Sequence, residues 1–505
     1  MINVTKTYLP NKEKYKAYID RIYESGWLTN NGPLLQELEQ RLADYLGVNN
    51  LILVANGSLA LQLAYKALDL KGEVITTPFS FVATTSTLVW EGLKPVFADI
   101  DSETFNLNPK NIESLITKQT SAIVPVHVFG NPCEVEKIQA IADKHSLKVV
   151  YDAAHAFGSE YKGKSVLNYG DISTLSFHAT KLFHTIEGGA VITNDDTLAK
   201  KIRLLINFGI TGPDCIGSVG TNAKMNEFEA AMGLCVLDEM ETIKQKRTEV
   251  WQNYSQKIMG LVTFQQWNAN SQNNCAYAPV LFESEEQLIT VEAKLKDNQI
   301  VPRRYFYPSL DTLDYLQSEQ VCDVSRDIAS RILCLPIYPE LNVEQTENIV
   351  QGIKSCVIIS KKDERVNETA ILNFFANIDQ DFSPKLSDQT PLKDYVQKIY
   401  NLAEVDCLLI GDERIIALIA YYLNTDTQTC YITVLGVEAS FRGKGLSKQL
   451  LSNCIKMAEK NDMIKLKLRA SKNHIAALNL YKANGFIISN EVSANSNKVY
   501  LQRDI

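Results

Sequence analysis

The chain has 505 residues and a formal net charge of −8, from 51 basic and 59 acidic side chains. At about 100–200 residues per domain, this length predicts two to four domains rather than one. The hydrophobic share of 45% and the charged share of 22% are typical of folded globular proteins and exclude a disordered or fibrous chain. The acidic balance provides no basic field for a phosphate backbone, so nucleic acid is not an expected partner.

No membrane span or leader is indicated. No apolar run approaches the ~20 residues of a membrane-spanning helix, and residues 415–423 are read as a buried strand. The first six residues lack the apolar core of a signal peptide. The ten cysteines are scattered, without a Cys-x-x-Cys pair, which favours free thiols over a disulfide framework or a zinc site. We therefore expect a cytoplasmic protein with no metal site.

Short β-branched runs alternate with amphipathic stretches between residues 48 and 200. Two of these stretches, 58–68 and 134–145, are expected to be helices. The alternation predicts a largely parallel sheet covered on both faces, with functional residues just after the strands. The expected strands are 51–55, 73–76, 95–98, 122–128, 148–152 and 172–177.

A domain boundary is expected near residue 357. After residue 245 the pattern becomes mixed, and it ends in a helical stretch at 343–354. The polar segment 360–365 that follows has no apolar periodicity. We predict domains 1–357 and 358–505, the second with 505 − 357 = 148 residues.

Three polar features accompany the expected strands of the first domain. Lys181 lies between two strands, ahead of a glycine pair, where an amine can be presented to a cofactor. Asp152 ends a strand, where its carboxylate can pair with a pyridinium nitrogen. Gly57 and Ser58 open a helix, whose free N–H groups and dipole suit a phosphate. Alone, each could be a surface lysine, a strand-end cap or a turn; their joint order predicts a pyridoxal phosphate (PLP) site.

Residues 1–357 resemble the nucleotide-sugar aminotransferase family of fold-type I PLP enzymes. The resemblance implies an α/β fold with a mainly parallel sheet in an α/β/α arrangement and a small C-terminal subdomain. It also implies PLP as cofactor, L-glutamate as amino donor and a homodimer. The motifs that carry it are Gly32-Pro33, Asn56-Gly57-Ser58 and residues 77–84 (TPFSFVAT), 125–130 (PVHVFG), 152–156 (DAAHA), 176–181 (SFHATK) and 303–306 (RRYF).

The resemblance also implies a role for each matching residue. Lys181 would form the Schiff base and shuttle the proton, and Asp152 would pair with the pyridinium nitrogen. His155 would lie beside the ring, where many members have glutamine, and Phe81 would stack on it unless it is a core aromatic. An ordinary loop cap is the alternative for Asn222. The residues that would hold the phosphate are Gly57, Ser58, Ser176 and, from the neighbouring subunit, Asn222. Core or loop roles stay open for His127, His178 and His184.

The segment around the lysine bears on which sugar carbon is aminated. Residues 176–181, with His178, and the turn at 187–189 resemble members that aminate C4 of a dTDP-4-keto-6-deoxyhexose. Residues 27–32, 76–84 and 131–133 resemble members whose product is dTDP-4-amino-4,6-dideoxyglucose. Members that act at C3 usually carry a tyrosine at position 178 and a glycine before the lysine. Amination at C3 stays the alternative.

A second group of candidate binding residues follows the apolar strand expected at 430–437. Its basic, glycine-containing turn leads into an amphipathic helix and forms an anion cradle. A further strand at 465–470 and a helix ending at Gly485 complete a resemblance to the GNAT acetyltransferase superfamily over about residues 360–505. The resemblance implies acetyl-CoA as co-substrate. The residues implied for its pyrophosphate are Arg442, Gly443, Lys444, Gly445 and Ser447, the last in place of the more usual glycine or alanine.

Other positions of this region are assigned in the same way. Asn473 would lie near the pantetheine arm, and Tyr481 would protonate the departing thiolate unless it is a packing aromatic. Glu438 is a candidate base by its position. Residues 366–410 are expected to shape the acceptor pocket.

Together the two regions predict one bifunctional enzyme. The first would transaminate a dTDP-4-keto-6-deoxyhexose, and the second would acetylate the new amine to give a dTDP-4-acetamido-4,6-dideoxyhexose for surface polysaccharide such as O-antigen. A GNAT-like domain that acts on another amine, or that only binds, is the alternative.

Overall fold

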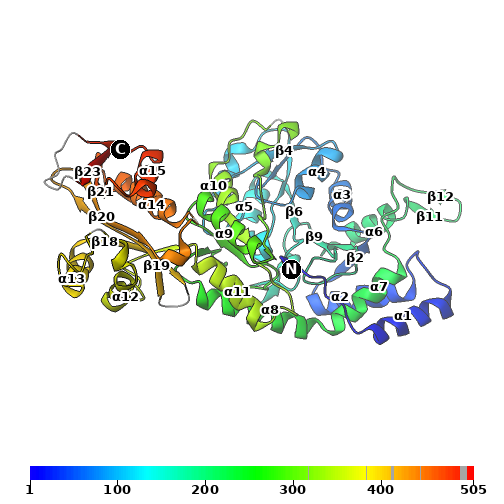
Figure 1. The fold of residues 1–505 in the computed structure, drawn as a ribbon. Helices are drawn as coiled ribbons and strands as arrows, with labels where there is room; N and C mark the ends of the chain where they lie inside the picture. Colours follow the sequence, from blue (N-terminus) through cyan, green and yellow to red (C-terminus); the bar gives the residue numbers. More distant parts are fainter. Residues whose placement is uncertain (317, 383, 411–413, 444, 490–496) are drawn as a thin grey trace. The chain divides into compact units, whose positions relative to one another are not determined.

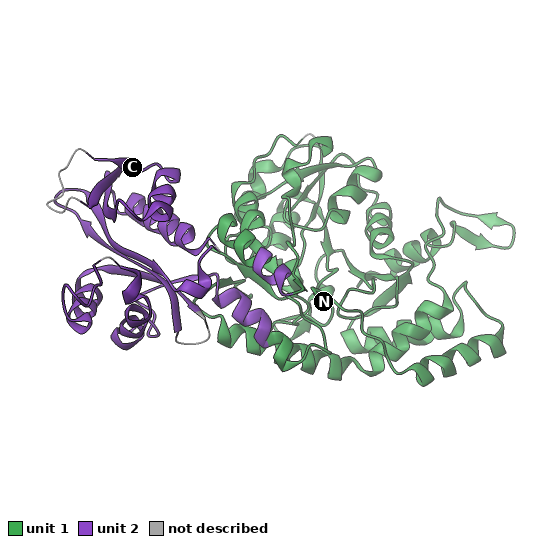
Figure 2. Ribbon diagram, viewed as in Figure 1, with its two compact units in different colours: residues 1–292, 299–346 green, residues 293–298, 347–505 purple. Residues whose placement is uncertain are grey.

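The computed structural model describes residues 1–316, 318–382, 384–410, 414–443, 445–489 and 497–505 (Figure 1). Two compact units make up the chain (Figure 2). Unit 1 comprises residues 1–292 and 299–346, and unit 2 comprises residues 293–298 and 347–505. Helix α11 (Val343–Lys354) therefore contributes most of its length to unit 2. In the described part of the chain, no helix is both long and apolar enough to cross a membrane.

The main sheet of unit 1 has seven strands, of which six are parallel. Its order is β2-β10-β9-β6-β5-β3-β4, and β10 runs antiparallel to both of its neighbours. This confirms the largely parallel sheet. The strand bounds are β2 (Asn50–Val54), β3 (Glu73–Thr76), β4 (Lys94–Phe97), β5 (Thr120–Val124), β6 (Lys148–Asp152), β9 (Ile172–Ser176) and β10 (Gly189–Thr193).

Strand β5 is shorter than the sequence pattern predicts. It ends at Val124 because Pro125 has no N–H to donate to the ladder. The apolar residues that follow enter a short 3-10 turn, Val128–Gly130, instead of extending the strand to residue 128. This turn brings Phe129 toward the ends of the neighbouring strands, where the backbone N–H of Phe129 meets a side chain that follows β6.

Helices cover the sheet of unit 1, and its apolar residues are packed between them. Helix α2 shows why: its leucines recur at helical spacing on one buried face, Gly32 and Pro33 begin it, and Gly47 ends it with φ 63°. The other helices are α1 (Lys12–Ser25), α3 (Gly57–Ala67), α4 (Ala83–Trp90), α5 (Val135–His145), α6 (Asp196–Leu205), α7 (Glu227–Asp238), α8 (Met240–Lys257), α9 (Glu285–Asp297) and α10 (Asp323–Arg331).

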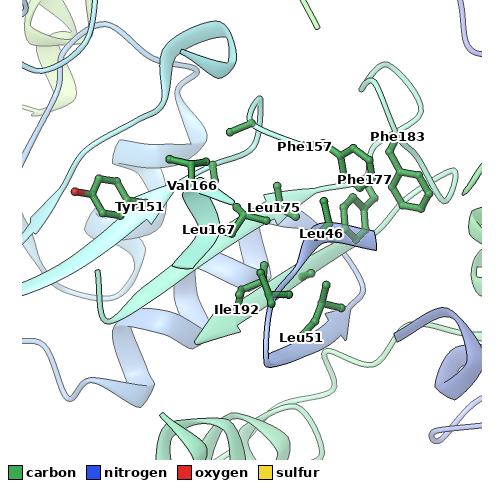
Figure 3. Packing of buried hydrophobic residues seen from close by; sticks show 14 of the residues in the cluster. Leu46, Leu51, Tyr151, Phe157, Val166, Leu167, Leu175, Phe177, Phe183 and Ile192 are labelled. Carbon is green, nitrogen blue, oxygen red and sulfur yellow. The ribbon is translucent and has the colours of Figure 1, made fainter. Parts of the chain in front are cut away.

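One part of this core adjoins the strand ends that carry the polar motifs. Phe157, Phe177 and Phe183 pack together, with ring centroids 4.7 Å apart for the stacked pair Phe157–Phe183 and 4.9 Å apart for Phe177–Phe183 (Figure 3). Because Phe177 directly follows β9, this packing fixes the loop that leads to Lys181.

A smaller sheet lies beyond α8 in sequence. It consists of β13 (Thr263–Phe264), β14 (Pro279–Leu281) and β16 (Ile332–Cys334), all antiparallel. Two short pairs accompany the main sheet, β1 (Ile2–Asn3) with β15 (Ile300–Val301) and β7 (Glu160–Tyr161) with β8 (Lys164–Ser165). A hairpin formed by β11 (Ile210–Gly212) and β12 (Cys215–Ile216) follows α6.

Unit 2 is built on a second seven-stranded sheet with the order β17-β18-β19-β20-β21-β23-β22. Among the neighbouring strand pairs of the described residues, only β20–β21 is parallel. Helices α12 and α13 lie on one face and α14 and α15 on the other (Figure 1). The bounds are β17 (Ile358–Ser360), α12 (Glu368–Ile378), α13 (Leu392–Leu402), β18 (Glu404–Ile410), β19 (Arg414–Asn424), β20 (Thr429–Val437), α14 (Leu446–Lys460), β21 (Lys465–Ser471), α15 (Ile475–Ala483), β22 (Ile487–Ile488) and β23 (Lys498–Asp504).

Candidate active sites

The polar motifs of unit 1 meet at one edge of the main sheet. Strand β6 ends at Asp152, β9 ends at Ser176, and α3 begins at Gly57 after β2. Since β2, β6 and β9 run in the same direction, their carboxyl ends share an edge. An added Cβ on Gly57 would lie 2.8 Å from the Ser176 Cβ, so these two residues are in direct contact. With Ser58 in the first turn of α3, they form a concave group of N–H and hydroxyl donors.

Asp152 is a buried carboxylate held by two donors. The Thr84 hydroxyl donates to Oδ2 at 2.7 Å, and the Ala154 N–H donates to Oδ1 at 3.1 Å. Ser80 lies 2.7 Å from the Thr84 hydroxyl and continues this chain of hydroxyl groups. Burial raises the pKa of Asp152, while the two donors and the charge of Lys181 oppose that rise. The carboxylate is thus fixed in position and ready to pair with a cationic ring nitrogen.

Lys181 presents its amine beside this carboxylate. Its Nζ donates a hydrogen bond to the Tyr277 hydroxyl at 3.2 Å, and its backbone N–H bonds to the His178 carbonyl. Burial lowers the pKa of Lys181 to about 8, although the charge of Asp152 acts to raise it. A substantial neutral fraction near physiological pH is the property that a nucleophilic lysine requires.

An aromatic wall faces the lysine. The His155 ring is stacked on the Phe306 ring at 5.5 Å and meets the Tyr277 ring edge-on at 4.7 Å. Its Nδ1 accepts a hydrogen bond from the Phe129 N–H at 3.3 Å, which leaves the proton of the neutral ring on Nε2. Burial, aided by the charge of Lys181, holds the pKa of His155 well below its usual range. His155 is therefore a neutral hydrogen-bond donor at this site.

The remaining histidines differ in their surroundings. His127 is buried and stacked on Tyr151 at 4.6 Å, and burial lowers its pKa to about 3. His184 is buried with Nε2 at 2.7 Å from the Tyr8 carbonyl. His178 is an exposed loop residue whose Nδ1 lies 2.7 Å from the Thr180 hydroxyl.

Two predicted cofactor residues are exposed. Phe81 precedes α4 and is 56% exposed, so it is not a core aromatic and leaves a ring face free for stacking. Asn222 is exposed and forms an isolated bridge with Asn207. The reach of Asn222 into a neighbouring subunit stays a prediction.

The residues of this edge fit PLP. A phosphate suits the donors around Gly57, where an added Cβ would collide with Ser176, and the buried Asp152 suits a protonated pyridine nitrogen. Lys181 supplies an amine with a lowered pKa. In the described residues, no cluster of His, Cys, Asp and Glu could hold a metal ion.

In unit 2, the turn after β20 has the backbone of an anion cradle. Gly443 and Gly445 have φ values of 75° and 80°, which L side chains adopt only with strain, and Gly445 begins α14. Ser447 follows in the first turn of this helix, where N–H groups have no intrahelical partner. The guanidinium of Arg442 donates to the Val437 carbonyl at 3.0 Å and pairs with Asp381. Lys444 lies outside the described residues.

Strands β20 and β21 pair over only part of their length. The parallel ladder runs from Thr429–Lys465 to Ile432–Leu468, although β20 continues to Val437 and β21 to Ser471. A register shift on the β19 side begins where this ladder ends. The two strands therefore separate next to the glycine turn, and the backbone that faces the gap can pair with an extended ligand.

Tyr481 on α15 is 8% exposed, and its ring lies 5.8 Å from that of Phe486. Burial raises the pKa of Tyr481 to about 12, so its hydroxyl keeps its proton at neutral pH. Asn473 is exposed at the end of β21, where its N–H lies 3.4 Å from the Ser471 hydroxyl.

Glu438, a candidate base by its position, is buried at the end of β20. It is 5% exposed; Arg414 donates to its Oε2 at 2.5 Å and Asn377 to its Oε1 at 3.0 Å. Because its carboxylate oxygens accept hydrogen bonds from α12 and β19, Glu438 joins these two elements, and its role as a base stays a prediction.

Comparison with known proteins agrees with both halves of this description. Residues 10–354 match the model of the DegT/DnrJ/EryC1/StrS aminotransferase family, and residues 372–486 match that of the acetyltransferase (GNAT) family. Unit 1 thus has the fold of a type I aminotransferase, followed by a GNAT domain. The chain belongs to the DegT/DnrJ/EryC1/StrS aminotransferase family.

Several relatives cover the aminotransferase part nearly completely. The dTDP-4-amino-4,6-dideoxy-D-glucose transaminase of Shigella dysenteriae is 46% identical over 360 residues, which cover 70% of this chain and 98% of the relative. The protein of the same name from Escherichia coli is 40% identical and covers 68% and 95%. The crystal structure of DesI with its TDP-sugar product has a TM-score of 0.67 and 34% identity, and covers 70% of this chain and 92% of that one.

Two residues that adjoin the site were not assigned a role from the sequence. Tyr277 meets Lys181 across 96 residues of chain and lies outside every motif. Membership of the 77–84 motif was the only sequence feature that pointed to Thr84. Its hydrogen bond to Asp152 joins residues 68 positions apart, so the sequence did not reveal it.

Proposed function

We propose that this chain performs two consecutive reactions on one nucleotide sugar. Unit 1 transfers an amino group from L-glutamate to C4 of a dTDP-4-keto-6-deoxyhexose, with glucose configuration, and depends on PLP. The GNAT domain then acetylates the new amine with acetyl-CoA. The observation that carries the proposal is that one sheet edge holds both an amine whose pKa is about 8 and a buried carboxylate whose charge acts on it.

Each site residue of unit 1 has a separate role in amino transfer. When bound, PLP supplies an electron sink for the carbon that loses its proton. Asp152 would keep the proton on its pyridine nitrogen, and the donors at Gly57, Ser58 and Ser176 would hold its phosphate. Lys181 Nζ takes the proton from the α-carbon of glutamate and, in the second half-reaction, delivers a proton to C4 of the sugar. Phe81 would stack on the pyridine ring.

The GNAT domain completes the second reaction. The glycine turn with Arg442 and Ser447 binds the pyrophosphate of acetyl-CoA, and the gap between β20 and β21 takes its pantetheine arm, with Asn473 beside it. The neutral sugar amine attacks the thioester carbonyl, and its proton leaves through water. As the C–S bond breaks, the Tyr481 hydroxyl protonates the thiolate.

Three features complete the proposal. The chain acts as a homodimer in which Asn222 reaches the phosphate of the neighbouring site. The domains divide at 357/358, between the spans 10–354 and 372–486 that match the two families. The product is a cytoplasmic precursor of surface polysaccharide such as O-antigen.

Product analysis tests the proposal directly. The purified protein is incubated with dTDP-4-keto-6-deoxyglucose and glutamate, with and without acetyl-CoA, and the nucleotide sugars are identified by mass spectrometry. We expect the amine without acetyl-CoA and the acetamide with it; absence of both refutes the proposal. Proton NMR of the amine decides between C4 and C3. If the amine forms and is never acetylated, the GNAT domain serves another amine or only binds.

A further inference from the structure

The aromatic wall beside Lys181 leads outward to an arginine with no assigned role. Lys181 Nζ contacts the Tyr277 hydroxyl, the Tyr277 ring meets the Tyr305 ring edge-on at 5.9 Å, and Arg303 places its Cζ 5.5 Å from the centre of the Tyr305 ring. Lys181 and Arg303 are thus joined by two contacting tyrosine rings. Tyr305 is partly buried and Arg303 is exposed, so this series of contacts runs from the reacting amine to solvent.

The backbone of Arg303 is fixed, whereas its charge is not neutralised. Its N–H and C=O both pair with Cys334 of β16, at 3.1 and 2.8 Å. Within the described ranges, its guanidinium has no ion pair with a carboxylate. Stacking over Tyr305 restricts the orientation of the guanidinium but leaves its N–H donors available.

Arg304, the next residue, shows the contrasting arrangement. Its guanidinium donates to Glu285 at 2.7 Å and to the Ser330 carbonyl, and it lies 3.7 Å from the centre of the Tyr307 ring. Nη2 of Arg304 is therefore held by an ion pair and a carbonyl, while its buried Nε has no hydrogen-bond partner among the described residues. Arg304 is thus ion-paired and partly buried, whereas Arg303 is exposed and has no carboxylate partner within the described ranges.

We propose that Arg303 is the residue that recognises the oxyanion of a substrate bound at Lys181. The inference rests on the proposed function, because both substrates of that reaction carry an oxyanion away from the reacting atom: glutamate its side-chain carboxylate, and the nucleotide sugar its diphosphate. Planar guanidinium donors match either group in a two-point contact. A fixed cation that is joined to the reacting amine by rigid aromatic rings would set how the substrate points into the site.

Binding of two unreactive probes to the holoenzyme tests the proposal. dTDP represents the diphosphate and maleate represents the dicarboxylate donor; each is titrated by calorimetry into wild type, Arg303→Gln, Arg303→Lys and Lys200→Gln. Lys200 is an exposed cation on α6 and serves as the matched control. Charge-assisted hydrogen bonds of this kind correspond to about a ten- to one-hundred-fold change in Kd.

We expect Arg303→Gln to raise the Kd of one probe ten-fold or more and Arg303→Lys to raise it less. Lys200→Gln should leave this Kd unchanged. Weaker dTDP binding assigns the residue to the nucleotide sugar, and weaker maleate binding assigns it to the amino donor. The proposal is overturned if the Kd values of Arg303→Gln for both probes lie within two-fold of those of wild type. The proposal is also overturned if Arg303→Gln and Arg303→Lys both lower the melting temperature and weaken the binding of dTDP and maleate equally, because Arg303 is then structural.

A separate measurement keeps this outcome distinct from failure of the proposed function. Wild-type holoenzyme is mixed with glutamate alone, and the cofactor absorbance is followed. No change refutes the transaminase itself, whereas a normal change together with unaltered probe binding in Arg303→Gln refutes only the role of Arg303.

Discussion

Lys181 should react as a neutral amine at a far lower pH than an ordinary lysine. With a pKa of about 8, roughly one-tenth of its amine is neutral at pH 7 and roughly nine-tenths at pH 9. A lysine with the usual pKa of ~10.4 is only about 0.04% neutral at pH 7, so Lys181 should then be about two-hundred-fold richer in the nucleophilic form. The difference arises from burial, which disfavours the charged ammonium.

Competitive labelling of the cofactor-free protein measures this difference. Trace acetic anhydride is added between pH 6 and 11, and acetylation of the Lys181 peptide is quantified by mass spectrometry. Exposed Lys200 provides an internal reference. We expect the Lys181 labelling midpoint near pH 8, and a lower midpoint in Asp152→Asn, because the Asp152 carboxylate favours the protonated lysine. Asp20→Asn removes an exposed carboxylate as the control and should leave the midpoint unchanged.

Two results would refute this reasoning. A midpoint at the usual lysine value would mean that the amine is solvated and that burial does not set its pKa. A midpoint that rises in Asp152→Asn would mean that the carboxylate does not act on the amine through its charge.

Three further changes have defined outcomes. Tyr481→Phe should lower acetyl transfer about 10²- to 10⁴-fold with little change in acetyl-CoA affinity, since only the acid is lost; thiol release measures it, and an unchanged rate contradicts the role. Gly57→Ala places a methyl group 2.8 Å from the Ser176 Cβ and should weaken PLP retention, whereas Gly212→Ala, with its nearest atom at 3.9 Å, should not; fluorescence titration compares them. Thr84→Val removes the 2.7 Å hydrogen bond to the carboxylate that ends β6 and should weaken PLP binding by about ten-fold. Thr84→Ser keeps the hydroxyl and is the control. Equal PLP affinities of Thr84→Val and wild type would contradict this prediction.

The sequence predicted the elements of unit 1 closely, because their signals are local. The six expected strands occur, and β3 and β6 have the predicted bounds. The exception, the strand expected at 122–128, shows the limit of apolar patterning. Its residues are buried as expected, but Pro125 ends the ladder and the remaining residues form a turn.

Candidate residues were found where chemistry coincides with a local position. Asp152, Ser176 and Gly57 lie at strand ends or helix starts, so a parallel sheet brings them to one edge without further information. The glycines at 443 and 445 were likewise readable, because left-handed backbone favours that residue type.

Glu438 shows what local position does not settle. Its place after β20 makes it a candidate base, but that place does not reveal its burial or the two donors that α12 and β19 supply to its carboxylate. Such partners come from segments 61 and 24 residues away, and nothing in their own sequence marks them as its neighbours.

The sequence by itself therefore determined the order of elements, the sheet edge that carries the first site, and the residue types present there. Only the tertiary structure decided which groups are buried and what each one touches. It set the pKa of Lys181, brought Tyr277 to its amine, and left Arg303 with a free charge while Arg304 was paired. The physical reason is that desolvation and Coulomb interaction depend on distances through space, which arise from packing of segments far apart in the chain.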